Sequence, residues 1–83
     1  MDLARTYWVF GTYQRRNGGD PLPSLALAVE SAGEAIERDP ANAKAYLHLG
    51  TALQQRGARE LESGQDPRAS LDDSIQAYGR AAE

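Results

Sequence analysis

Two stretches of the sequence share the pattern Gly-x-Asp-Pro-x-x-Ser-Leu: Gly18-Gly19-Asp20-Pro21-Leu22-Pro23-Ser24-Leu25 and Gly64-Gln65-Asp66-Pro67-Arg68-Ala69-Ser70-Leu71. Glycine after a helical segment ends the helix, because it adopts the left-handed conformation without a Cβ penalty. The aspartate that follows can accept the free amide hydrogens of a new helix, and proline at the first helical position loses no hydrogen bond. The pattern therefore predicts a helix-loop-helix corner that the chain uses twice.

The corner belongs to a longer internal repeat with a period of 46 residues, because residues 1–37 align with 47–83 without a gap. The identical pairs are Leu3/Leu49, Gly11/Gly57, Gly18/Gly64, Asp20/Asp66, Pro21/Pro67, Ser24/Ser70, Leu25/Leu71, Gly33/Gly79, Ala35/Ala81 and Glu37/Glu83. Chance would give only about two or three such identities, and a period of this size is typical of stacked structural units.

The spacing of apolar residues predicts four helices, at residues 2–17, 23–38, 43–62 and 67–82. No stretch alternates with period two over a useful length, and residues that favour helices are common. The connections are short, which implies antiparallel neighbours, and Asn42 is the expected N-cap of the third helix. We therefore expect an all-α fold of two antiparallel helix pairs, residues 1–42 and 43–83.

Two glycines lie inside the predicted third helix, where each costs about 1 kcal/mol relative to alanine. We expect Gly50 and Gly57 to let a neighbouring helix approach closely. The fourth helix should pack on the third through Tyr78 and Ala81.

These residues resemble a known helical repeat. The second unit matches its pattern of apolar, small and aromatic positions at Tyr46, Leu49, Gly50, Leu53, Ser74 and Tyr78. The first unit matches at Tyr7, Phe10, Gly11, Ala28, Ala35 and Pro40, with Gln14 and Ala32 where aromatic residues are usual. Residues 37–46 are similar to the junction between repeats. The chain thus resembles the tetratricopeptide (TPR) family over nearly its whole length.

The period departs from the family's usual length of about 34 residues, and the excess lies at the corner inside each unit. This long-corner variety resembles arrays attached to bacterial serine/threonine protein kinases. The resemblance implies a right-handed α-α superhelix segment, which is a solenoid. It also implies a scaffold that binds a peptide or a partner domain through the concave face of its stacked helix pairs.

In the family, the first helices of the units line the groove. The resemblance therefore gives as candidate partner-binding residues Arg5, Trp8, Thr12, Lys44, Leu47, Thr51, Gln54 and Gln55. Trp8 has two interpretations, as an exposed anchor for the partner or as cover for the adjacent helix. Thr12 and Thr51 stand where some relatives carry the asparagines that clamp a chaperone's terminal carboxylate, so that ligand is not expected.

Stacked pairs each leave an apolar strip that the next pair covers. Two units are fewer than the three that a stable stack usually needs, so we expect a fragment of a longer array. The uncovered strip on the last helix, or the first helix with Trp8 and Val9, could pair with another copy to form a homo-oligomer. The alternative function is accordingly a structural spacer or self-association element of a larger signalling protein, such as a bacterial kinase.

Chemistry is not expected of this chain. It has no cysteine, and its single histidine, His48, lies outside any zinc-binding spacing. We predict no enzyme activity, no catalytic residues, no cofactor and no metal. A net charge of −3 argues against a nucleic-acid partner, and the apolar run Tyr7–Phe10 is far shorter than the ~20 residues that span a membrane. Without a predicted signal peptide, a cytoplasmic location is the default expectation.

Overall fold

The computed structural model describes residues 3–83 and places four helices there: α1 (Leu3–Arg16), α2 (Leu22–Arg38), α3 (Ala43–Glu62) and α4 (Arg68–Ala81). The predicted all-α fold of two antiparallel pairs is confirmed. Each observed bound lies within one residue of the bound predicted from the sequence. The predicted start of the first helix, at residue 2, falls outside the described residues.

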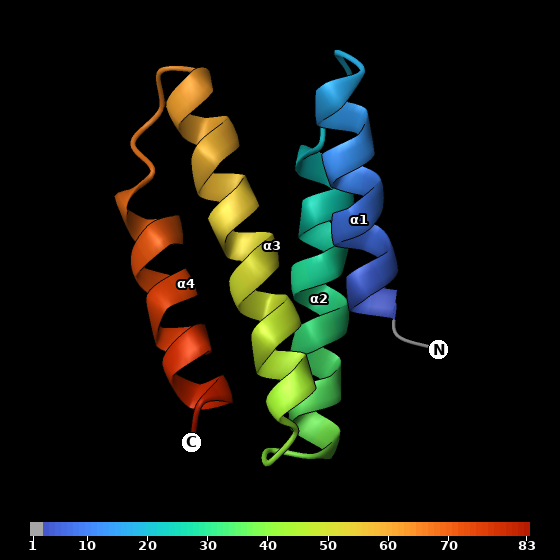
Figure 1. The fold of residues 1–83 in the computed structure, drawn as a ribbon, viewed down its shortest axis with the longest axis vertical. Coiled ribbons are helices and arrows are strands. Elements are labelled where there is room, and N and C mark those ends of the chain that lie inside the picture. The colour runs from blue at the N-terminus through green and yellow to red at the C-terminus, as the bar shows by residue number, and fades with distance from the viewer. Residues whose placement is uncertain (1–2) are drawn as a thin grey trace.

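The helices form a row of two hairpins (Figure 1). Both corners, α1–α2 and α3–α4, lie at one end of the molecule, and the α2–α3 junction lies at the other. Helix α3 packs against α1, α2 and α4, whereas α4 packs against α3 alone within residues 3–83. This arrangement is compatible with TPR-like stacking, and it differs from a closed four-helix bundle because α4 does not return to α1.

The two corners have the same backbone geometry. Gly18 and Gly64 have φ of +79° and +78°. In both corners the amide of the residue after the glycine donates to the carbonyl oxygen five residues before the donor: Gly19 to Gln14 at 2.7 Å and Gln65 to Glu60 at 2.8 Å. Glycine is favoured here because a side chain in the left-handed region is strained.

The helix that follows each corner begins with an aspartate turn. Asp20 Oδ1 accepts from the Leu22 amide at 3.0 Å, and Asp66 Oδ1 accepts from the Arg68 amide at 3.0 Å. The predicted role of aspartate is thus observed. The proline lies one position earlier than predicted, as the residue that immediately precedes the helix.

Glycine also sets the distance between the two helices of each pair. A Cβ atom on Gly11 would lie 3.2 Å from Leu25 Cδ2, and one on Gly57 would lie 2.8 Å from Leu71 Cδ2. In the sequence alignment these two contacts are the same contact, one in each unit. The hydrogen on Cα therefore lets leucine of the second helix fill the space beside the first.

A side-chain hydrogen bond repeats in the same way. Ser24 Oγ donates to Gln14 Oε1 at 2.7 Å, and Ser70 Oγ donates to Glu60 Oε1 at 2.5 Å. Both serines are buried, so the bond satisfies a polar group that would otherwise be costly. The period seen in the sequence is therefore also a period of packing contacts.

The junction between the units is capped as predicted, because Asn42 Oδ1 accepts from the Ala45 amide at 3.1 Å. Small side chains dominate the core. Alanine occupies most of its buried hydrophobic positions, and the two larger buried hydrophobic side chains are those of Leu25 and Leu53.

Within residues 3–83, no helix combines the length and apolarity that crossing a membrane requires.

Candidate partner-binding site

The seam between α1 and α3 holds the indole of Trp8. Trp8 Nε1 donates to His48 Nδ1 at 3.1 Å, and the two rings lie 6.3 Å apart. One turn further along, Thr12 Oγ1 lies 2.6 Å from Gln55 Oε1. Trp8, Thr12 and Gln55 are all half-buried. Of the two interpretations of Trp8, this geometry supports cover for the adjacent helix.

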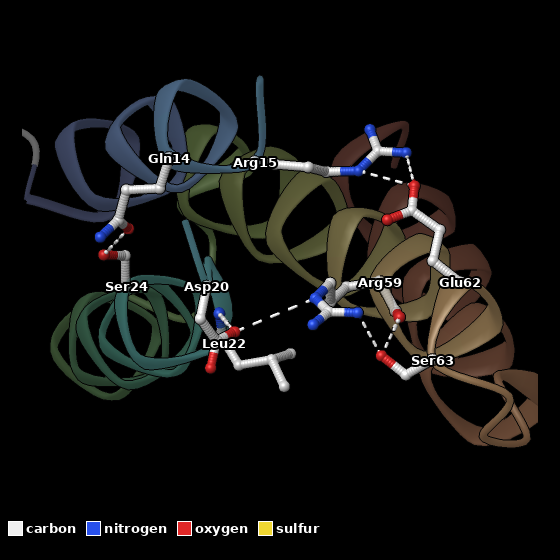
Figure 2. Close-up of polar contacts among 8 residues, drawn as sticks. All are labelled: Gln14, Arg15, Asp20, Leu22, Ser24, Arg59, Glu62 and Ser63. Atoms are coloured by element: carbon white, nitrogen blue, oxygen red, sulfur yellow. Dashed lines mark hydrogen bonds and ion pairs between the residues drawn. The ribbon is translucent and has the colours of Figure 1, made fainter. Parts of the chain in front are cut away.

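Charged side chains close the same seam near the corners (Figure 2). Arg15 pairs with Glu62, its Nε lying 2.9 Å from Glu62 Oε1. Arg59 Nε lies 4.0 Å from Asp20 Oδ1, so α3 also reaches the first corner. The hydrogen bond from Arg15 lowers the pKa of the Glu62 carboxyl and raises the pKa of Arg15. Both partners are exposed, so the pair fixes orientation more than it stabilises the fold.

The seam between α3 and α4 is closed by a tyrosine. Tyr78 Oη lies 2.9 Å from Thr51 Oγ1 and donates to Gln54 Oε1 at 3.1 Å. These contacts hold one edge of the tyrosine against α3. Thr51 and Gln54 still face solvent in part, because Thr51 is half-buried and Gln54 is exposed.

An open hollow lies beside Tyr78, with a volume of about 360 Å³. Its lining residues are Ala43, Lys44, Leu47, Tyr78, Ala81 and Ala82. The lining is mainly hydrocarbon, with one cationic group on Lys44. Such a hollow can take an apolar side chain, while Lys44 can pair with a carboxylate beside it.

The candidate residues therefore separate into different places. Trp8, Thr12 and Gln55 lie in the α1–α3 seam, Thr51 and Gln54 meet Tyr78, and Lys44 and Leu47 line the open hollow; Arg5 is exposed on α1. Lys44 and Leu47 are brought together with an accessible apolar surface, whereas Trp8 and Thr12 are already in contact with the second unit.

Sequence reasoning did not include the α4 side of this hollow. The spacing predicts that Tyr78 and Ala81 pack on the third helix, and in the structure both also line the open surface. The available signal was the small pair Ala81–Ala82, three and four residues after Tyr78, which leaves room on the face that α4 turns to α3.

A second hollow, of about 410 Å³, runs over α3 between Val29 of α2 and Ala77 of α4. Arg80 crosses its end with its guanidinium carbon 6.0 Å from the centre of the Tyr46 ring. This hollow is bordered by several charged side chains, and it contains none of the candidate residues. The first hollow is therefore the better match to the predicted site.

Among residues 3–83, no group of three or more acidic or histidine side chains is placed to hold a metal ion. Comparison of the chain with protein-family models, with curated proteins and with solved structures finds no match.

Proposed function

We propose that the chain is a TPR-type scaffold module that binds a peptide segment of a protein partner, within a larger cytoplasmic signalling protein. One observation carries the proposal: Lys44 and Leu47 line the same open hollow as Tyr78 and Ala81. The module offers a surface and carries out no reaction of its own.

The chemistry of the hollow suggests what the peptide contains. Leu47, Tyr78 and the alanines form a surface that suits one apolar side chain of a peptide, because burying hydrocarbon surface away from water lowers the free energy of the complex. Lys44 suits a carboxylate one or two residues away. The preferred segment is therefore an apolar residue next to an aspartate or glutamate.

Selection from a library of random peptides on the immobilised protein tests this directly. Peptides that carry an apolar residue beside an acidic one should be enriched, and their affinity should be measured by fluorescence anisotropy. Leu47→Asp should weaken that affinity by about tenfold or more, which corresponds to about 1.4 kcal/mol. Lys44→Ala should weaken acidic peptides more than neutral ones.

Leu27 provides the matched control, because its side chain on α2 is 43% exposed against 46% for Leu47. Leu27→Asp changes the surface in the same way at a site outside the hollow, so it should leave peptide affinity unchanged. Equal losses in the two variants, or selected peptides that bind Leu47→Asp as tightly as the native protein, would refute the proposed site.

A further inference from the structure

The contact between the two units defines which surfaces a stacked unit covers. On α3, the side nearest the first unit is buried or half-buried at Leu49, Ala52, Arg56 and Arg59. Arg59 approaches Asp20, and Leu49 and Arg56 line a hollow with Val29, while Arg56 also donates to Ser70 of α4. The residues 46 positions before these four α3 residues occupy the same side of α1, and all of them are exposed: Leu3, Thr6, Phe10 and Tyr13. The outer face of α1 is thus the uncovered version of a surface that α3 buries.

The other half of the contact behaves in the same way. On α2, Val29 lines a hollow together with residues of α3. Leu22, Gly33 and Ile36 lie at helical spacing from Val29, and all four residues are half-buried. Their counterparts on α4 are all exposed: Arg68, Ile75, Gly79 and Ala82. Val29 and Ile75 show the difference most clearly, since Ile75 has the same kind of side chain with 68% of its surface exposed.

Some polar contacts between the units are replaced by apolar residues at the uncovered faces, whereas Trp8 is replaced by Gln54 and Leu22 by Arg68. Inside the chain, Thr12 of α1 meets Gln55 of α3. In the alignment, the residue that replaces Thr12 is Ala58 and the residue that replaces Gln55 is Val9. If a second copy stacks on the first, the polar pair Thr12–Gln55 is replaced at the new contact by the apolar pair Ala58–Val9.

The charged pair at the end of the seam changes in a related way. Arg15 corresponds to Leu61, and Glu62 corresponds to Arg16. An ion pair is replaced by a leucine beside the stem of an arginine, which can cover apolar surface while its charge stays in water. No pair of like charges arises from the positions of the polar contacts Thr12–Gln55 and Arg15–Glu62.

We propose that a second copy of this chain stacks on the first, head to tail. The outer face of α1 in one copy packs on the end face of the other, which α3 and α4 form. The second copy is the occupant that fits, because the two faces are the two halves of one interface that the chain already contains between its own units. The association is heterologous, so it continues beyond a dimer as long as both faces are free.

This inference goes beyond the proposed peptide binding and does not depend on it. Ala82 of the uncovered α4 face also lines the hollow at Leu47, so a stacked copy and a bound peptide share part of that surface. Phe10 and Ile75, which represent the two faces, lie outside the hollow. Substitutions at these two residues therefore test stacking separately from peptide binding.

Analytical ultracentrifugation of the 83-residue chain over a range of concentrations is the experiment. The native chain should form species that grow with concentration. Phe10→Glu, at a side chain that is 50% exposed, and Ile75→Glu should each weaken self-association by about tenfold or more. Both substitutions are at exposed positions, and circular dichroism should show unchanged helix content.

A mixture of the two variants gives the decisive result. Phe10→Glu keeps the end face of α3 and α4, and Ile75→Glu keeps the outer face of α1, so the mixture should form a one-to-one dimer and nothing larger. Leu27→Glu, on neither face, should associate as the native chain does. A native chain that remains monomeric at every concentration, variants that associate normally, or a mixture that forms no dimer would each overturn the proposal.

Discussion

The ring of Tyr78 lies directly against the backbone of Gly50, so that a Cβ atom on that glycine would be 2.9 Å from Tyr78 Cδ1. In the first unit the corresponding residues are Ala4 and Ala32, both buried, and they border a hollow of about 390 Å³. The second unit therefore pairs a large side chain with no side chain, whereas the first pairs two small ones. The same backbone arrangement is thus packed in two different ways.

Substitution Gly50→Ala should destabilise the protein. The added methyl group would overlap the tyrosine ring, and such overpacking costs about 1–3 kcal/mol. The better helix propensity of alanine returns up to about 1 kcal/mol. A net loss should appear in urea unfolding as a lower midpoint, with thermal unfolding shifted down by about 4–8 °C for each kcal/mol.

Gly33→Ala is the control, because a Cβ atom there would meet nothing within 4 Å. Only helix propensity acts, so this variant should gain up to about 1 kcal/mol. A Gly50→Ala variant that is as stable as Gly33→Ala would show that the ring of Tyr78 does not lie where the structure has it.

The two corner glycines should respond equally to substitution. Gly18 and Gly64 share a positive φ, and a Cβ atom would meet no neighbour at either residue. The cost of alanine is therefore that of the left-handed backbone alone, about 1–2 kcal/mol at each site. Chemical unfolding of the two single variants measures it. A large loss at one corner with none at the other would argue against equivalent corners.

The ion pair of Arg15 and Glu62 gives a prediction about pH. Because the pKa of Glu62 is lowered in the folded chain, its contribution to stability is present above the pKa of the unfolded chain. It is lost as the pH falls through the folded pKa. Arg15→Gln should raise the pKa of Glu62, as followed by NMR of the carboxyl carbon, and remove that part of the acid dependence. An unchanged pKa in the variant would contradict the pairing.

The hydrogen bond from Trp8 to His48 should couple the two units. Trp8→Phe removes the donor and keeps an aromatic ring, and His48→Ala removes the acceptor. A double-mutant cycle from urea unfolding should give a coupling energy of about 0.5–1.5 kcal/mol. The matched pair Tyr13→Phe and His48→Ala should be additive, since Tyr13 stacks on Phe10 instead. Additivity for Trp8 as well would place its indole away from α3.

The sequence was sufficient for the helices and corners because their signals are local. The positive φ of Gly18 and the turn at Asp20 depend on residues within a few positions of each other. The period then predicted that the second corner would match. Gly50 and Gly57 were also predicted to admit a neighbouring helix, and the structure confirms it with Tyr78 and Leu71.

The candidate site was harder to predict, because it depends on which side chains meet across helices. Tryptophan is a residue type typical of exposed binding anchors. Only the position of His48 on α3 shows that the Trp8 indole makes its hydrogen bond within the chain. The hollow at Leu47 needs the relative position of α3 and α4, which helix periodicity does not specify. The apolar face of a helix is predictable from residue spacing. Which side chains on that face stay exposed to solvent depends on how the neighbouring helices pack.

Observation of nuclear Overhauser effects between side chains in solution tests the central claim most directly, namely that the chain is one packing unit used twice in a row. We predict contacts of Gly11 with the Leu25 methyl groups, and of Gly57 with the Leu71 methyl groups. Within one molecule, no contact should appear between the side chains of α4 and those of α1. Loss of either repeated contact, or α1–α4 contacts within a monomeric chain, would contradict the account.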